Sequence, residues 1–275
     1  MPPGLGSAWR GAYEATRAVL SPAAVRGVAL ECAWIAAHLT TYPLGILRER
    51  LPVDSRRLSL DGLDPIRRGL LVGDVEAAGT PILMVHGIVD NRSIFTVLRR
   101  ALRRRGFARV VAVDYGWLAT DVRSLAAGLA AQVERVCDLT GYDRVHIVAH
   151  SMGGLVARYY VQRLGGDERV HTLVTLGTPH AGTRWARALP HPVVRQLRPG
   201  SGFLAELAAP SPRCTTRFLV VWSDMDQVIV PRESARLVHP DLDAREFLVR
   251  GVGHLSLPVD GRVVHQICSM LADVT

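Results

Sequence analysis

Short apolar runs rich in β-branched residues alternate with longer stretches of helical periodicity from residue 81 to the end of the chain. This alternation is typical of βαβ units, whose right-handed crossovers build a parallel sheet with helices on both faces. The runs predict strands at 82–85, 110–113, 145–148, 172–176, 218–222 and 246–249. The stretches between and after them predict helices near 92–105, 121–139, 152–164, 232–238 and 260–272. The chain is therefore expected to be an α/β protein with a mostly parallel sheet.

Two segments depart from this rhythm. Residues 1–50 predict an N-terminal helical extension, docked on the main domain or lying on a membrane surface, and 51–78 predict a connector with short strands. Residues 183–213 hold large apolar side chains among prolines and arginines, in a connection longer than usual. Counted with the short strands of the connector, this insertion follows the sixth strand. We expect a cap or lid at 183–213 within a domain spanning 51–275.

The chain is basic, with a net charge of +8, and all 33 of its basic residues are arginines. These arginines are spread along the whole chain and accompany no nucleic-acid motif, so nucleic acid is not an expected partner. The one dense cluster, on the polar side of the predicted helix 92–105, comprises Arg99, Arg100, Arg103, Arg104 and Arg105. It is read as a solvated helix face, with peripheral contact to an anionic membrane as the alternative.

The expected location is cytoplasmic, with association to a membrane surface left open. No stretch reaches the ~18 uninterrupted apolar residues of a membrane span. Glu14 and Arg17 interrupt the apolar core that a signal peptide needs. The four cysteines, Cys32, Cys137, Cys214 and Cys268, lack the spacing of a metal site, and they allow disulfides without arguing for them. No metal is expected.

The segment Ala149-His150-Ser151-Met152-Gly153 follows a predicted strand and opens a predicted helix. A sharp strand–turn–helix of this kind exposes a serine hydroxyl at the carboxyl edge of a sheet. Strand and helix cross so closely there that the residues two before and two after the serine must be small, as Ala149 and Gly153 are. Ser151 is therefore the predicted nucleophile.

A serine hydroxyl needs a base to take its proton, and a carboxylate to orient that base. His254 follows the last predicted strand on a glycine-rich loop and is the predicted base. The carboxylate should follow the preceding strand, where Asp226 is preferred and Asp224 is the alternative.

A tetrahedral intermediate needs two backbone N–H donors for its oxyanion. Met152, directly after the serine, and Ile88, in the loop after the first predicted strand, are the predicted donors. His86, His150 and His180 are read as structural neighbours of the site. The predicted chemistry needs no cofactor.

The motifs VHGIVDN, AHSMGGLVARYY, LGTPHAGT, SDMDQVIVP and GVGHLSLP, taken together over residues 80–272, resemble the bacterial triacylglycerol lipase and esterase branch of the α/β hydrolases. The resemblance implies hydrolysis of carboxylic esters by Ser151, Asp226 and His254, with Ile88 and Met152 as oxyanion donors. A small-molecule or lipid ester would be the substrate, and Phe203 and Leu204 of the insertion are expected to bind its acyl chain. The alternatives are an acyltransferase, a thioesterase, and a non-catalytic membrane-surface or partner-binding module on the same scaffold.

Overall fold

The computed structural model of the protein describes residues 78–88, 91–113 and 120–273. The predicted N-terminal extension 1–50, the connector up to residue 77 and Cys32 lie outside the described residues. No helix within the described ranges is long and apolar enough to cross a membrane.

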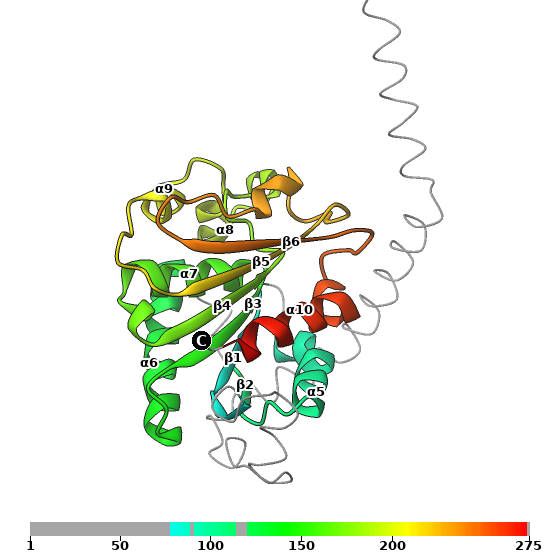
Figure 1. Ribbon diagram of the computed structural model, residues 1–275. Helices are drawn as coiled ribbons and strands as arrows, with labels where there is room; N and C mark the ends of the chain where they lie inside the picture. The colour runs from blue at the N-terminus through cyan, green and yellow to red at the C-terminus, as the bar shows by residue number, and fades with distance from the viewer. Residues whose placement is uncertain (1–77, 89–90, 114–119, 274–275) are drawn as a thin grey trace, which may run out of the picture.

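Six parallel strands form one sheet in the order β2-β1-β3-β4-β5-β6 (Figure 1). Their bounds are β1 Ile82–Val85, β2 Val110–Ala112, β3 Val145–His150, β4 Val170–Leu176, β5 Arg217–Ser223 and β6 Asp243–Val249. The order reverses once, since β1 lies between β2 and β3, as in a doubly wound sheet. The predicted parallel α/β sheet is therefore confirmed, with strand ends that differ by a few residues.

Helices cover both faces of this sheet (Figure 1). On one face lie α6 Val122–Thr140, α7 Met152–Arg163, α8 Pro192–Gln196 and α9 Gly202–Ala208. On the other lie α5 Thr96–Arg104 and α10 Gly261–Ala272. Short 3-10 turns complete the described structure: η2 Arg92–Phe95, η3 Gly166–Glu168, η4 Arg184–Arg187, η5 Arg232–Ala235 and η6 Leu257–Val259.

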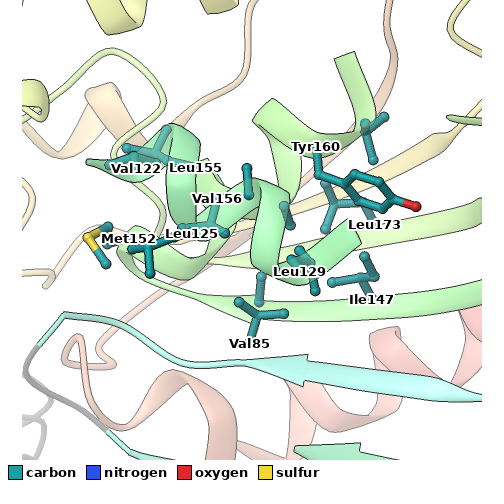
Figure 2. Close-up of a cluster of buried hydrophobic side chains, with 14 of the residues drawn as sticks. Val85, Val122, Leu125, Leu129, Ile147, Met152, Leu155, Val156, Tyr160 and Leu173 are labelled. Carbon is teal, nitrogen blue, oxygen red and sulfur yellow. The ribbon is translucent and has the colours of Figure 1, made fainter. Parts of the chain in front are cut away.

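Alternation along the strands divides the core into two clusters. In β1, Leu83 and Val85 face the α6–α7 side, whereas Ile82 and Met84 face the α5–α10 side. Successive strand side chains point to opposite faces, so a strand buried on both sides is apolar throughout. Figure 2 shows the α6–α7 cluster, in which apolar side chains of both helices pack on those of the strands.

Capping residues set the ends of the longest helices. The Asp121 carboxylate accepts a hydrogen bond from the N–H of Arg123 at the start of α6, and Gly141 ends that helix with a φ of 72°. Asp260 caps α10 in the same way through Arg262 and Val263. The caps place both helix starts one residue later than the sequence predicts.

One predicted helix is wrong. Instead of a helix over 232–238, only the short turn η5 forms, and Arg236 is extended with φ −72° and ψ 146°. Seven residues give fewer than two helical turns, which are marginal without packing. Pro240 further disfavours a helical conformation for His239, the residue before it.

The insertion 183–213, which follows β4, packs beside α6 and α7 over much of its length. The side-chain oxygen of Gln196 accepts a hydrogen bond from the N–H that begins α6 at Val122 (3.1 Å). The buried Arg158 of α7 donates to the carbonyl of Leu207 in α9 (2.9 Å). The two short helices α8 and α9 thus complete the helical layer on this face of the sheet.

Candidate active site

The predicted site residues follow three strands at the same edge of the sheet. Ser151 follows β3, Asp226 follows β5 and His254 follows β6. All strands are parallel, so their carboxyl ends meet at one edge, where open α/β sheets bind their ligands. The topology alone therefore brings these segments together.

Ser151 lies in a strained turn. Its φ is 54° and its ψ is −129°, and among the described residues it is the one non-glycine with a positive φ. Its N–H donates to the carbonyl of Leu176 at the end of β4 (2.9 Å). Residues other than glycine rarely adopt this backbone conformation unless the surrounding structure enforces it.

Close packing of α7 on β1 explains the small residue two positions after the serine. A Cβ at Gly153 would lie 2.5 Å from the carbonyl oxygens of both Val85 and His86. These are backbone atoms of the neighbouring strand end and cannot rotate away. The turn at Ser151 therefore requires a glycine at 153, which is stricter than the small residue that the sequence pattern predicts.

His254 and Asp226 form a buried pair. The His254 Nδ1–H donates to Oδ2 of Asp226 at 2.7 Å, and the two side chains are 4% and 1% exposed. The other carboxylate oxygen accepts the N–H groups of Val228 (2.8 Å) and Ile229 (2.9 Å). Burial would raise the pKa of the Asp226 carboxyl, but His254 and these two N–H groups hold it below its ordinary value.

Gly177, directly after β4, leaves room for this pair. A Cβ there would lie 3.0 Å from Nδ1 of His254 and 3.1 Å from Oδ2 of Asp226. Gly177 also follows Leu176, whose carbonyl holds the N–H of Ser151. The His254–Asp226 pair and the turn at Ser151 therefore border the same strand end.

Asp224, the alternative acid, has a different partner. Its Oδ1 accepts the N–H of Gly251 at 2.8 Å, on the loop that leads to His254. The structure thus brings Asp226 to the imidazole and uses Asp224 to hold the backbone of the same loop. Two loop carboxylates so close in sequence look alike, and only the folded contacts separate them.

The predicted oxyanion donors lie at this edge too. Met152 is the first residue of α7, where the helix itself supplies no acceptor for the N–H. Ile88 follows β1 and packs, partly buried, against the α6–α7 cluster. In the same loop, the buried His86 donates from Nδ1 to the carbonyl of Gly87 (2.9 Å), a bracing contact.

Phe203 and Leu204 are packed in the helical layer. They are 2% and 8% exposed and belong to the core cluster of α6 and α7. The Phe203 ring stacks on that of Tyr159, with ring centroids 5.5 Å apart. This packing supports a structural role for both side chains, so their contact with an acyl chain stays a prediction.

The sequence did not predict that an exposed aromatic side chain of the insertion lies beside Asp226. The Trp185 indole N–H donates to the carbonyl of Gln227 (3.0 Å), next to Asp226, and the side chain is 57% exposed. The neighbouring Val228 is also exposed. Trp185 and Gln227 are 42 residues apart in the sequence, so no local pattern predicts their contact. The insertion therefore contacts, through Trp185, the loop that carries Asp226, here called the acid loop.

Residues 80–211 match a family model described as alpha/beta hydrolase fold. Two curated triacylglycerol lipases, from Pseudarthrobacter phenanthrenivorans and Burkholderia plantarii, are each 29% identical over 114 residues, or 38% of this chain. The alignments span about a third of those relatives (35% and 31%). Among solved structures, mature Bacillus licheniformis lipase BlEst2 has a TM-score of 0.59 at 17% identity, covering 78% of this chain and 95% of that one.

These likenesses agree with the observed architecture. The sheet order, the strained serine turn between β3 and α7, and the histidine loop after β6 occur in the order that the family motifs require. The structural likeness and the family model both support this fold. The chain therefore has the alpha/beta hydrolase fold, and over 114 residues it is similar to bacterial triacylglycerol lipases.

Proposed function

We propose that this protein cleaves carboxylic esters with a hydrophobic acyl chain through an acyl-enzyme on Ser151. The observation that carries the proposal is the buried His254–Asp226 pair, which borders the strained turn of Ser151 at the carboxyl edge of the sheet. Each group has a role that its surroundings support. No cofactor takes part in the proposed steps.

The hydrogen bond to Asp226 sets the tautomer of His254. Because Nδ1 carries the proton that Asp226 accepts, Nε2 of the neutral ring holds a lone pair. Nε2 takes the proton of the Ser151 hydroxyl while Oγ bonds to the ester carbonyl carbon. The imidazolium then formed is stabilised by the Asp226 carboxylate, whose pKa is held low.

The tetrahedral intermediate collapses when the bond to the alcohol oxygen breaks and His254 returns its proton to that oxygen. Water then attacks the acyl-enzyme and gives a proton to His254. As the bond from the acyl carbon to Oγ breaks, His254 returns that proton to Ser151 and the carboxylic acid leaves. The N–H groups of Met152 and Ile88 stabilise the oxyanion in both halves. One such donor is worth about 10²–10³ in kcat.

The exposed apolar side chains beside the acid loop favour a hydrophobic acyl chain. Trp185 and Val228 offer apolar surface next to Asp226, without filling a core position. Each methylene removed from water there contributes ~0.8 kcal/mol. The curated relatives are triacylglycerol lipases, which fits a fatty acyl ester as the substrate class.

Contact with an anionic lipid surface is the proposed mode of access to such substrates. The arginines at 100, 103, 104 and 105 are exposed, and α5 contains no acidic residue. A basic helix face of this kind is attracted to negatively charged headgroups by long-range electrostatics.

A fluorophosphonate probe tests the nucleophile. We expect the probe to label Ser151, and the enzyme to hydrolyse 4-nitrophenyl esters in a panel from acetyl to palmitoyl. Ser151→Ala should lose the label and on the order of 10⁶ in kcat, whereas the exposed control Ser269→Ala should change neither. A Ser151→Ala variant that keeps a tenth of wild-type turnover refutes the proposal. Adding glycerol and measuring acyl glycerol would show whether an alcohol competes with water.

A further inference from the structure

Three side chains hold the backbone of the loop that carries His254. Asp224 accepts the N–H of Gly251, and the Ser223 hydroxyl donates to the carbonyl of Val252. The third contact is made by His150, whose Nε2 lies 3.1 Å from the carbonyl oxygen of His254 itself. The loop is therefore held just before His254 and at His254 itself.

The three contacts come from the ends of two strands. Ser223 and Asp224 lie at the end of β5, on the segment that also carries Asp226. Ser223 and Asp224 therefore hold the His254 loop against the segment that carries Asp226, and so keep the base close to its carboxylate. His150 is the last residue of β3, directly before Ser151. Of these three contacts, the one from His150 connects the base to the strand of the nucleophile.

The geometry at His150 defines what its ring does. The side chain is fully buried, and its ring centroid lies 4.7 Å from that of His254 at an angle of 48°. A backbone carbonyl can only accept, so the proton of this contact is on Nε2 of His150. One residue thus donates to the backbone of His254 and also contacts its ring.

We propose that His150 is a positioning residue that fixes the distance between the Ser151 hydroxyl and the His254 imidazole. The inference rests on the proposed function. His150 is covalently joined to Ser151 and hydrogen-bonded to His254, so a shift of either reacting residue strains this contact. Proton transfer between two side chains needs them within hydrogen-bond reach. A misplacement of about 1 Å can lower a rate 10²-fold.

Two substitutions separate the hydrogen bond from the ring contact. His150→Phe keeps a ring beside His254 but removes the donor, whereas His150→Gln keeps an N–H donor and removes the ring. With turnover expressed per fluorophosphonate-labelled Ser151, we expect His150→Phe to lower kcat about tenfold or more. His150→Gln should stay within about threefold of wild type. KM should change little in both, because His150 is buried behind the reacting groups.

His146 provides a matched control in the same strand. It is also fully buried, and it lies at the other end of β3, where burial and the nearby His171 and Arg217 lower its pKa to about 3. His146→Phe repeats the substitution at a distance from the site. Whatever its effect on the melting temperature, it should leave kcat per labelled serine unchanged.

The ratio of kcat between His150→Gln and His150→Phe decides the inference. A ratio of about three or more supports it, and a smaller ratio overturns it, whatever the two absolute values are. Nitrogen-15 NMR of the wild-type protein gives a second test that needs no folded Phe variant: a His150 ring with its proton on Nδ1 alone overturns the proposed contact. Failure of the wild type to label or to hydrolyse esters would instead refute the proposed function.

Discussion

Replacing Asp226 by asparagine tests the proposed acid, and the structure determines which way the new amide points. Oδ1 of Asp226 accepts two backbone N–H groups, and Oδ2 accepts Nδ1–H of His254. In one orientation the amide oxygen keeps both backbone contacts and its NH₂ faces His254. In the other, the NH₂ opposes two backbone donors. Each lost buried contact costs about 1–3 kcal/mol, so the first orientation is favoured.

The favoured orientation changes the tautomer of the base. A donor facing Nδ1 moves the imidazole proton to Nε2, which can then no longer accept the Ser151 proton. The expected loss is about 10⁴ in kcat, equivalent to ~5.4 kcal/mol at 1.36 kcal/mol per factor of ten. Asp224→Asn is the matched control, because its amide oxygen can still accept the N–H of Gly251. We expect it to lower kcat less than threefold.

Both variants are measured as kcat for a short 4-nitrophenyl ester, per labelled Ser151, together with the melting temperature. A larger loss in Asp224→Asn than in Asp226→Asn would transfer the role of the acid to Asp224. An Asp226→Asn enzyme that retains a tenth of wild-type kcat would show that the tautomer argument is wrong.

Three further predictions concern packing, substrate and partner. Gly153→Ala should lower the free energy of unfolding by at least about 1–3 kcal/mol in urea titrations, since its Cβ would meet two carbonyl oxygens at 2.5 Å. Gly128→Ala, with open space in α6, should instead stabilise by about 0.5–1 kcal/mol, and equal effects would refute the packing argument. Trp185→Ser should raise KM for long acyl esters more than for acetyl esters. The control Val238→Ser, an exposed residue shortly before the start of β6 and thus at the other edge of the sheet, should not. Parallel changes in the two variants would remove Trp185 from the acyl site. Changing Arg100, Arg103 and Arg104 of α5 together to Gln should weaken co-sedimentation with phosphatidylglycerol vesicles. The same change at three exposed arginines elsewhere, Arg187, Arg245 and Arg250, should weaken it less, and equal losses would exclude a specific role for the α5 face.

The sheet was predictable because its strands, apart from the largely exposed edge strand β6, are buried on both faces. Runs such as ILMV at 82–85 are apolar without interruption, and their spacing leaves room for one crossover helix each. The turn at Ser151 was predictable for a similar local reason, since its neighbours at 149 and 153 must be small. Both signals reside in a few consecutive residues.

The surroundings of the site could not be predicted in the same way. An apolar residue such as Phe203 has the same sequence signal in a core as in a substrate pocket, and its stacking on Tyr159 depends on where the insertion packs. The contacts of Asp224 with Gly251 and of His150 with His254 join residues 27 and 104 positions apart. Such contacts depend on the relative placement of strands, which no local pattern records.

The backbone of Ser151 sets a limit on how stable this molecule can become while it stays active. A residue other than glycine at φ 54° and ψ −129° raises the energy of the folded state by about 1–3 kcal/mol. Glycine would adopt the same conformation without that strain, and Ser151→Gly would remove the nucleophile at the same time. Selection for stability and selection for catalysis therefore oppose each other at this single position. Stabilising substitutions have to be found elsewhere in the chain.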